Sequence, residues 1–326
     1  MNLSDIGRAA PLTAAIALVA LGATLTPTLA VAAAPMVRTQ APGFYRMMLG
    51  DFEMTAINDG TIMLDAAGLL AEPATETNVA LERSFESNPV ETSDNAFLVN
   101  TGTKLVLIDT GGGALLGPTL GKLLINLRAA GYSPEQVDDI FLTHMHPDHL
   151  GGLTKNGAMA FPNATVHASR RDAEYWLSQV NLDKAPPDKK GYFQGAMASV
   201  KPYADVGRFK PFDSDEELVP GVRSVATPGH TAGHTSYLVE SKGQRLMLVG
   251  DLIHVAAVQF DRPDVTIAFD SDAGSAASTR KKVFGALASE GALVGAAHLQ
   301  FPALGHLRSA GKSWRWAPVN YSTQLR

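Results

Sequence analysis

The sequence THMHPDHLGG, residues 143–152, places three of the chain's nine histidines and one aspartate within six consecutive positions. These residues are His144, His146, Asp148 and His149. Imidazole and carboxylate groups are the ligands that zinc and similar divalent ions take when no thiolate is present, and the chain has no cysteine. The stretch is therefore either a histidine-rich surface loop or part of a metal site, and the rest of the chain has to distinguish the two.

Further candidate ligands follow segments that have the pattern of strands. His230 follows 222–226, Asp251 follows 245–249 and His298 follows 292–296. The cluster itself follows the short apolar segment 140–142, and His144 and His146, two positions apart, would project to one side of an extended chain. Ligands at strand ends are held rigidly, as a metal site requires. Two ions sharing the cluster would need these extra ligands, one of them a bridging carboxylate.

The first 34 residues differ in composition from the remainder. An apolar run at 12–25 is followed by Pro27 and by small residues with an A-x-A pattern at 30–32. This pattern is typical of a secretory signal peptide cleaved near 32–34, and the alternative is an uncleaved membrane anchor. We therefore expect a mature domain at 35–326 that is exported, periplasmic or secreted, with no stable membrane insertion after cleavage.

Composition limits the remaining possibilities. The chain has 326 residues, is 45% hydrophobic and carries a formal net charge of −5, which is typical of a globular protein and argues against a nucleic-acid partner. Strands are predicted at 44–49, 52–57, 96–100 and 104–108, with a turn at 58–60, and helices at 117–130, 171–181 and 273–289. The segment 182–220 has no clear hydrophobic period of a helix or a strand. The order of strands, helix, strands and helix along the chain predicts one α/β domain in which helices cover sheets.

The complete set of motifs resembles the signature of the metallo-β-lactamase superfamily. The matching elements are HxHxDH at 144–149, TPGHTAGHT at 227–235, VGD at 249–251 and His298. The resemblance implies an αββα sandwich with the site at one edge. It assigns His144, His146 and His230 to one metal ion, Asp148, His149 and His298 to the other, and Asp251 to both.

The resemblance also implies supporting roles. Asp109 in LIDTG would orient a ligand histidine, and His234 would support the loop that carries His230 without binding metal. The absence of cysteine excludes the branches that use a cysteine ligand. Segments such as HLQFPALGHLR at 298–308 are similar to methyl parathion hydrolase and its lactonase and arylesterase relatives.

The function implied is hydrolysis of lactones and aryl esters by a dinuclear metal centre, with organophosphate triesters as the alternative substrate. Two divalent ions, expected to be Zn²⁺ with Mn²⁺ or Co²⁺ as substitutes, lower the pKa of a bridging water so that hydroxide attacks the substrate. Asp148 is the candidate to accept or relay the proton, and Asp251 is the bridging ligand.

The resemblance also implies a substrate pocket. Trp176 and Phe193 match aromatic positions that line the pocket in the subfamily, and neighbouring motifs suggest Leu116 and Phe269. His254, three residues after Asp251, is the fifth candidate, and core packing is an equally good interpretation of each apolar residue. His254 would hydrogen-bond the substrate or the leaving group, or else be a structural histidine. A small-molecule substrate is the expected partner, and a homodimer is expected from the resemblance alone. A non-catalytic metal-binding protein on the same fold is the alternative from another functional class.

Overall fold

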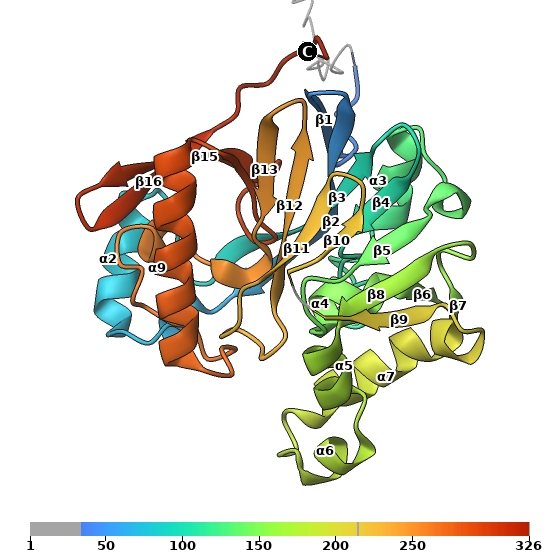
Figure 1. The fold of residues 1–326 in the computed structure, drawn as a ribbon. Coiled ribbons are helices and arrows are strands. Elements are labelled where there is room, and N and C mark those ends of the chain that lie inside the picture. The colour runs from blue at the N-terminus through green and yellow to red at the C-terminus, as the bar shows by residue number, and fades with distance from the viewer. Residues whose placement is uncertain (1–33, 214, 326) are drawn as a thin grey trace, which may run out of the picture. The chain divides into compact units, whose positions relative to one another are not determined.

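Two seven-stranded β-sheets form the centre of the molecule (Figure 1). In this computed structural model, residues 34–213 and 215–325 are described, and those from Ala41 on form one unit. The predicted signal peptide lies outside the described residues, apart from Ala34. In spatial order the first sheet contains β1 (Phe44–Leu49), β2 (Phe52–Leu64), β3 (Val90–Asn100), β4 (Leu105–Ile108), β5 (Asp139–Phe141), β8 (Thr165–Ser169) and β9 (Phe209–Phe212).

The second sheet combines antiparallel strands with one parallel pair. Its spatial order is β10 (Glu217–Val219), β11 (Val222–Ala226), β12 (Thr235–Ser241), β13 (Gln244–Leu248), β14 (Leu293–Gly295), β15 (Leu304–Ala310) and β16 (Ser313–Pro318). Only β13 and β14 pair in parallel in this sheet, whereas β4, β5, β8 and β9 are all parallel in the first. Parallel neighbours bring their carboxyl ends to the same edge, which is where the motif residues follow.

Helices cover the outer faces of both sheets. Helices α3 (Leu123–Ala129), α5 (Arg170–Trp176) and α7 (Lys190–Asp205) share an apolar core with the first sheet, and α9 (Ala273–Glu290) shares one with the second. The remaining short helical elements are α1 (Ala66–Leu69), α2 (Ala74–Arg83), η1 (Pro134–Gln136), α4 (Pro147–Leu150), η2 (Gly151–Leu153), α6 (Gln179–Lys184), η3 (Gly250–Leu252) and α8 (Ala256–Gln259), and a small hairpin joins β6 (Thr154–Lys155) and β7 (Ala158–Met159).

The core between the sheets is apolar and fully buried. Met54 and Phe97 of the first sheet pack in one cluster with Tyr237 and Leu248 of the second. Burial of such side chains is the dominant favourable contribution to folding. The predicted αββα sandwich is confirmed by this arrangement of two facing sheets and outer helices.

The turn predicted at 58–60 is wrong, because β2 continues to Leu64. The pairing of β2 with β3 instead shifts register between Asn58 and Gly60, which is a β-bulge. Gly60 has φ 144°, and a Cβ atom there would lie 2.1 Å from the carbonyl oxygen of Thr119. The bulge therefore accounts for the glycine, and a bulge and a turn share the same sequence signal.

Three helical predictions also need correction. The predicted helix 117–130 begins only at Leu123, because Gly117 and Gly121 have positive φ angles of 103° and 80°. The predicted helix 171–181 is two short helices, α5 and α6. The segment 182–220, for which no helix was predicted, contains the 16-residue helix α7. Its internal Pro202 weakens the helical pattern of the sequence, because proline is rare inside helices. Among the described residues, no helix is long and apolar enough to cross a membrane.

Candidate metal centre

The first four candidate ligands lie after β5: His144 and His146 stand in the segment before the short helix α4, and Asp148 and His149 stand within it. β5 is three residues long and buried, and it ends three residues before His144. Pro147 occupies the first turn of α4, where its fixed φ angle and missing N–H are tolerated. The chain turns there, so Asp148 and His149 approach the site from a second direction.

The second sheet supplies the other three ligands. His230 lies in the loop between β11 and β12, Asp251 in η3 directly after β13, and His298 in the segment after β14. All three are buried, with exposed fractions of 5% or less. The two sheets therefore meet the cluster from opposite sides, and the seven predicted ligands come together.

The ligand atoms form two groups. One group contains His144, His146 and His230, and the other contains Asp148, His149, Asp251 and His298; within each group the ligand atoms lie within 4.8 Å of one another. The Nδ1 atom of His146 is 3.0 Å from the Nε2 atom of His230. These groups match the two ion sites that the sequence motifs predicted.

Asp251 lies between the two groups. Its Oδ2 atom is 3.3 Å from His230 Nε2 and 3.7 Å from His144 Nε2, while its Oδ1 atom is 3.1 Å from His149 Nε2 and 3.2 Å from His298 Nε2. Oδ2 is also 3.2 Å from His298 Nε2. The carboxylate therefore lies against imidazoles of both groups, which is the arrangement that a bridging ligand requires.

Unpartnered buried atoms indicate that divalent ions fit here. The Nε2 atoms of His144 and His149 and the Oδ1 atom of Asp251 are buried without a hydrogen-bond partner among the described residues. An unsatisfied buried polar atom is costly, so several converging on one point need a ligand. Imidazole and carboxylate donors without sulfur suit Zn²⁺ and neighbouring divalent metals.

The cluster is electrostatically prepared for cations. Burial lowers the pKa of His144 and His146 well below the usual imidazole range, and neighbouring imidazoles reinforce the effect. Burial also lowers the pKa of His149 and His298, but nearby carboxylates, Asp251 first for both, outweigh it and raise the pKa well above its usual value. His144 and His146 therefore favour the neutral form that binds a metal ion, whereas His149 and His298 favour the protonated form until an ion displaces the proton.

Two ligand histidines are oriented by partners on the first sheet. The Nδ1 atom of His149 donates to Asp109 Oδ2 at 2.8 Å, and the Nδ1 atom of His298 donates to the carbonyl oxygen of Ser93 at 3.1 Å. Asp109 also accepts hydrogen bonds from the backbone N–H and the hydroxyl of Thr143. A bond at Nδ1 fixes the ring and directs Nε2 toward the metal, so Asp109 lies as predicted.

The His234 side chain holds the backbone of Asp251 in place. Its Nε2 atom accepts the backbone N–H of Asp251 at 3.1 Å, and its Nδ1 atom lies 2.8 Å from the hydroxyl of Thr227. Burial lowers its pKa to about 3, so the ring is neutral and Nε2 can accept. The second histidine of TPGHTAGHT is therefore a support for Asp251 and is absent from the two ligand groups.

An aspartate and an arginine that the sequence reasoning missed hold the other side of the site. Asp270 accepts a hydrogen bond from His230 Nδ1 at 2.9 Å. Burial raises the pKa of Asp270, but this bond, the charge of His230 and the backbone N–H of Ile267 together outweigh burial and lower it. The Arg280 guanidinium is buried 4.0 Å from Asp270 and donates to the carbonyl oxygens of Leu252 and Val265. Arg280 therefore fixes both Asp270 and the backbone beside the bridging ligand.

Asp172 is a second missed carboxylate. It accepts hydrogen bonds from the backbone N–H groups of Met145 and Gly233 and from the hydroxyl of Thr231. It thereby joins the loop of His144 and His146 to the loop of His230. Neither Asp172 nor Asp270 stands in a recognisable motif, and Asp172 lay inside a predicted helix where an acid is normally a surface residue.

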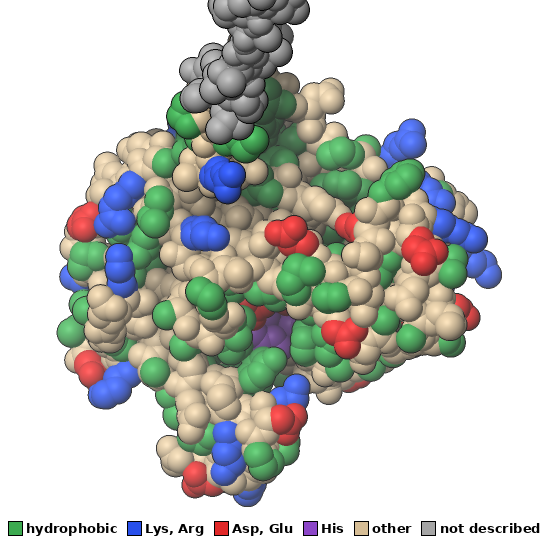
Figure 2. Space-filling model, turned by 180° about the vertical axis from the view of Figure 1, so that it is seen from behind, with side chains coloured by type: hydrophobic (Ala, Val, Ile, Leu, Met, Phe, Trp, Pro, Cys, Tyr) green, Lys and Arg blue, Asp and Glu red, His purple; other side chains and the backbone are tan. Residues whose placement is uncertain are grey.

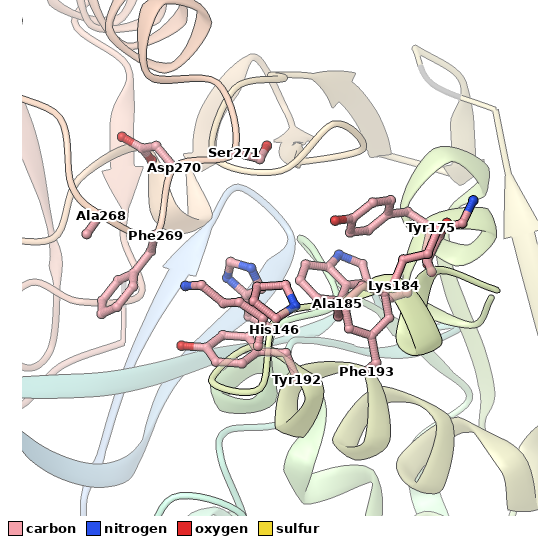
Figure 3. Close-up of a pocket in the computed structure, with 14 residues that line it drawn as sticks. His146, Tyr175, Lys184, Ala185, Tyr192, Phe193, Ala268, Phe269, Asp270 and Ser271 are labelled. Atoms are coloured by element: carbon pink, nitrogen blue, oxygen red, sulfur yellow. The ribbon is translucent and has the colours of Figure 1, made fainter. Parts of the chain in front are cut away.

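A pocket of about 400 Å³ opens above His146. Figure 2 shows histidine at the base of a hollow with hydrophobic side chains around it. Of the predicted pocket residues, Trp176, Phe193 and Phe269 line this pocket. In Figure 3, Phe269 lies on one side of His146 and Phe193 on the other. Leu116 is 42% exposed in the loop before α3 and is not among the lining residues.

His254 lies beside the metal cluster and behind Phe269. Its Nε2 atom is 3.0 Å from Asp251 Oδ2, its ring centroid is 6.2 Å from that of Phe269, and its Nδ1 atom is buried without a partner among the described residues. The ligand atoms of His230, Asp251 and His254 also lie within 4.8 Å of one another. The geometry therefore places His254 at the centre but outside the lining of the main pocket.

A sandwich of two sheets with histidines and aspartates at one edge defines a class of metalloproteins. A family model described as the metallo-beta-lactamase superfamily matches residues 90–298, more than half of the chain. The chain belongs to this superfamily, and the resemblance inferred from the motifs is confirmed.

Particular relatives are similar over different lengths. The crystal structure of AbOPH, a hydrolase in the beta lactamase superfamily, is 39% identical with a TM-score of 0.83 and covers 87% of this chain and all of AbOPH. AidC, a dizinc quorum-quenching lactonase solved with a product, is 30% identical with a TM-score of 0.79 over 86% of this chain and 99% of AidC. An N-acyl homoserine lactonase of Bacillus cereus is 33% identical over 39% of this chain and 43% of its own length.

Proposed function

We propose that this chain is a metal-dependent hydrolase of lactones and aryl esters. The observation that carries the proposal is the pair of ligand groups around Asp251, with buried unpartnered nitrogen and oxygen atoms, at the base of an aromatic pocket. The names of the relatives AidC and N-acyl homoserine lactonase support lactone hydrolysis. A protein that only binds metal ions would not need a substrate-sized pocket that opens onto the ligands.

The centre would supply both metal chemistry and a proton acceptor. Divalent ions held here supply Lewis acidity and lower the pKa of a bound water. Asp148 is the most exposed ligand, at 19% of its side chain, and lies 3.5 Å from His298 Nε2. Burial raises its pKa, but His149 first and then His298 outweigh burial and lower it. Asp148 is therefore ionised at neutral pH and is our candidate to accept the proton released when the ester is attacked.

The shape of the pocket favours planar substrates. Five aromatic side chains line it: Tyr175, Trp176, Tyr192, Phe193 and Phe269. Flat rings stack or pack edge-to-face on such walls, which suits the phenol of an aryl ester or a fused lactone. The alternative substrate, an organophosphate triester, is supported by the subfamily resemblance of the sequence. A tetrahedral phosphorus centre with three substituents needs more width, so we place the ester first.

The decisive experiment compares three substrates on one enzyme. The chain from residue 35 onward is loaded with Zn²⁺ or Mn²⁺, and kcat/KM is measured for an aromatic lactone, an aryl ester and a dimethyl phosphotriester with a nitrophenol leaving group. We expect chelator-sensitive turnover that is highest on the lactone or the ester. A higher rate on the phosphotriester would establish the alternative, and two bound ions with no turnover would refute hydrolysis of these classes.

A variant pair controls for metal-independent turnover. His149→Ala removes a predicted ligand, whereas His167→Ala removes a histidine that pairs with Asp139 at 3.0 Å on the first sheet. Only the His149→Ala variant should lose activity.

Export also belongs to this proposal, since the apolar run at 12–25 and the small residues after it support a cleaved signal peptide. N-terminal sequencing of protein recovered from the periplasm or medium tests cleavage, and recovered protein that still begins at Met1 would refute it. Gel filtration tests the expected homodimer.

A further inference from the structure

Two lysines line the pocket above the metal centre. Lys184 ends α6 and Lys189 immediately precedes α7, and both border the same cavity as the ligand His146. Figure 3 shows Lys184 on the side of Tyr175 and Phe193, opposite Phe269. The two ammonium groups thus belong to the wall through which a substrate reaches the metals.

Their charges are not neutralised within this wall. Among the described residues, neither lysine has a carboxylate within 4.0 Å, whereas Lys201 pairs with Asp205 at 2.8 Å. Lys189 instead has its Nζ atom 5.2 Å from the ring centre of Tyr192. The acidic lining residue, Asp270, is buried and bonded to His230.

The acidic residues next to these lysines in sequence lie outside the lining of the pocket. Asp183 accepts a hydrogen bond from Gln179 on its own helix, and Asp188 precedes Lys189 without lining the pocket. The lining therefore offers positive charge beside apolar rings, which complements an aromatic anion.

We propose that the preferred substrates are aryl esters or lactones whose aromatic part carries a carboxylate or another negative charge, which Lys184 and Lys189 recognise at the pocket wall. The proposal rests on the hydrolase function proposed above and specifies its substrate class. Water screens exposed ammonium groups, so each lysine should contribute about a twofold to fivefold preference. The preference should also decline with salt, because exposed charges are screened over about 10 Å at 0.1 M ionic strength.

The test uses a matched pair of esters with the same leaving ring. On metal-loaded enzyme, kcat/KM is measured for 4-acetoxybenzoate and for the neutral 4-acetoxybenzamide. We expect the anionic ester to be preferred, and the preference to fall about twofold to fivefold with each of Lys184→Gln and Lys189→Gln. Lys190→Gln is the matched control, because Lys190 begins α7 without lining the pocket. An equal preference in wild type and the double variant would overturn the proposal.

A binding measurement separates this proposal from the reaction itself. Binding of 4-acetamidobenzoate and 4-acetamidobenzamide, which are amides, is followed by calorimetry. If the anion binds more tightly and this preference weakens in the double variant, the proposal is supported. Absence of ester hydrolysis in the same protein would then refute the proposed function alone. If the double variant retains the preference for the anion, the carboxylate binds the metal ions instead, and recognition by the lysines is overturned.

Discussion

The metal centre and the pocket wall above it are built in opposite ways. The ligands follow strands of both sheets, and His149, His230 and His298 each have a second bond that fixes the ring. The wall comes largely from α5, α6 and the start of α7, where Tyr175 is 48% exposed and Trp176 keeps an unpartnered N–H. The rigid metal centre determines which reaction is catalysed. The pocket wall, whose side chains make fewer bonds within the protein, determines which substrates bind.

Removing the bridging carboxylate should have the largest effect. In Asp251→Asn, one neutral amide replaces the two oxygens that face the two ligand groups. Because metal ions provide several kcal/mol of transition-state stabilisation, we expect kcat/KM to fall by at least about 1000-fold, with fewer than two metal ions per chain by elemental analysis. Asp264→Asn, at an exposed pair with Lys281, is the control. Two retained ions and activity within tenfold would contradict the role of Asp251.

Acid should weaken metal binding at the centre. His149 and His298 have a raised pKa without metal, so each is protonated near neutral pH and must lose that proton to bind an ion. Lower pH therefore favours the metal-free form, and affinity should fall about tenfold per pH unit for each proton released, or about 100-fold for two. Chelator competition at pH 6, 7 and 8 measures the slope. Calorimetry in buffers of different ionisation enthalpy counts the protons, and zero released protons would disprove the explanation.

The same contrast explains what could be predicted from sequence. The seven residues that the structure brings together in two groups were all named from the sequence, because metal binding requires particular residue types and the motifs stand in the expected order along the chain. Asp109 and His234 followed from the same motifs. Asp270, Asp172 and Arg280 were missed because any buried carboxylate or guanidinium at the right place would do, and only the folded chain shows where they meet.

The fold shows a similar division. The end of β3 at 96–100, its partner β4 and the helix α9 were predicted, whereas the first half of β3 was missed and the bulge at Gly60 was misread as a turn. Helix α7 was missed because Pro202 and its polar residues weaken the pattern, although Phe193 and Tyr203 pack in the core. Tertiary packing, which local pattern does not encode, decides such elements.

Disturbing an orienting carboxylate should affect the centre less than removing a ligand. Asp270→Asn weakens the bond to His230 and leaves Arg280 without its nearby charge. Loss of such a partner typically costs 10-fold to 100-fold in metal affinity, and we expect that range for the group of His144, His146 and His230. Asp139→Asn is a matched control, because it alters a similar carboxylate–imidazole pair with His167 at 3.0 Å. Equal metal affinities in both variants would show that Asp270 is merely structural.

His254 lies where centre and wall meet, so its substitution should have an intermediate character and the smallest effect. His254→Leu removes Nε2, 3.0 Å from Asp251, and the unpartnered Nδ1. If His254 contacts the substrate, the loss of one hydrogen bond to a charged or polarised group should lower kcat/KM for the ester about tenfold. Metal content should then stay at two ions per chain, because the seven ligands remain.

Metal analysis of the same variant distinguishes the two interpretations of this histidine. Loss of an ion together with activity would assign His254 to the metal centre, in keeping with its place among the ligand atoms of His230 and Asp251. Unchanged rates on both ester and phosphotriester would leave it a structural residue. A lower ester rate with an unchanged or higher phosphotriester rate would mean that this single position shifts the substrate preference. In that case His254 would belong to both parts, since it contacts the rigid metal centre and also determines which substrate is preferred.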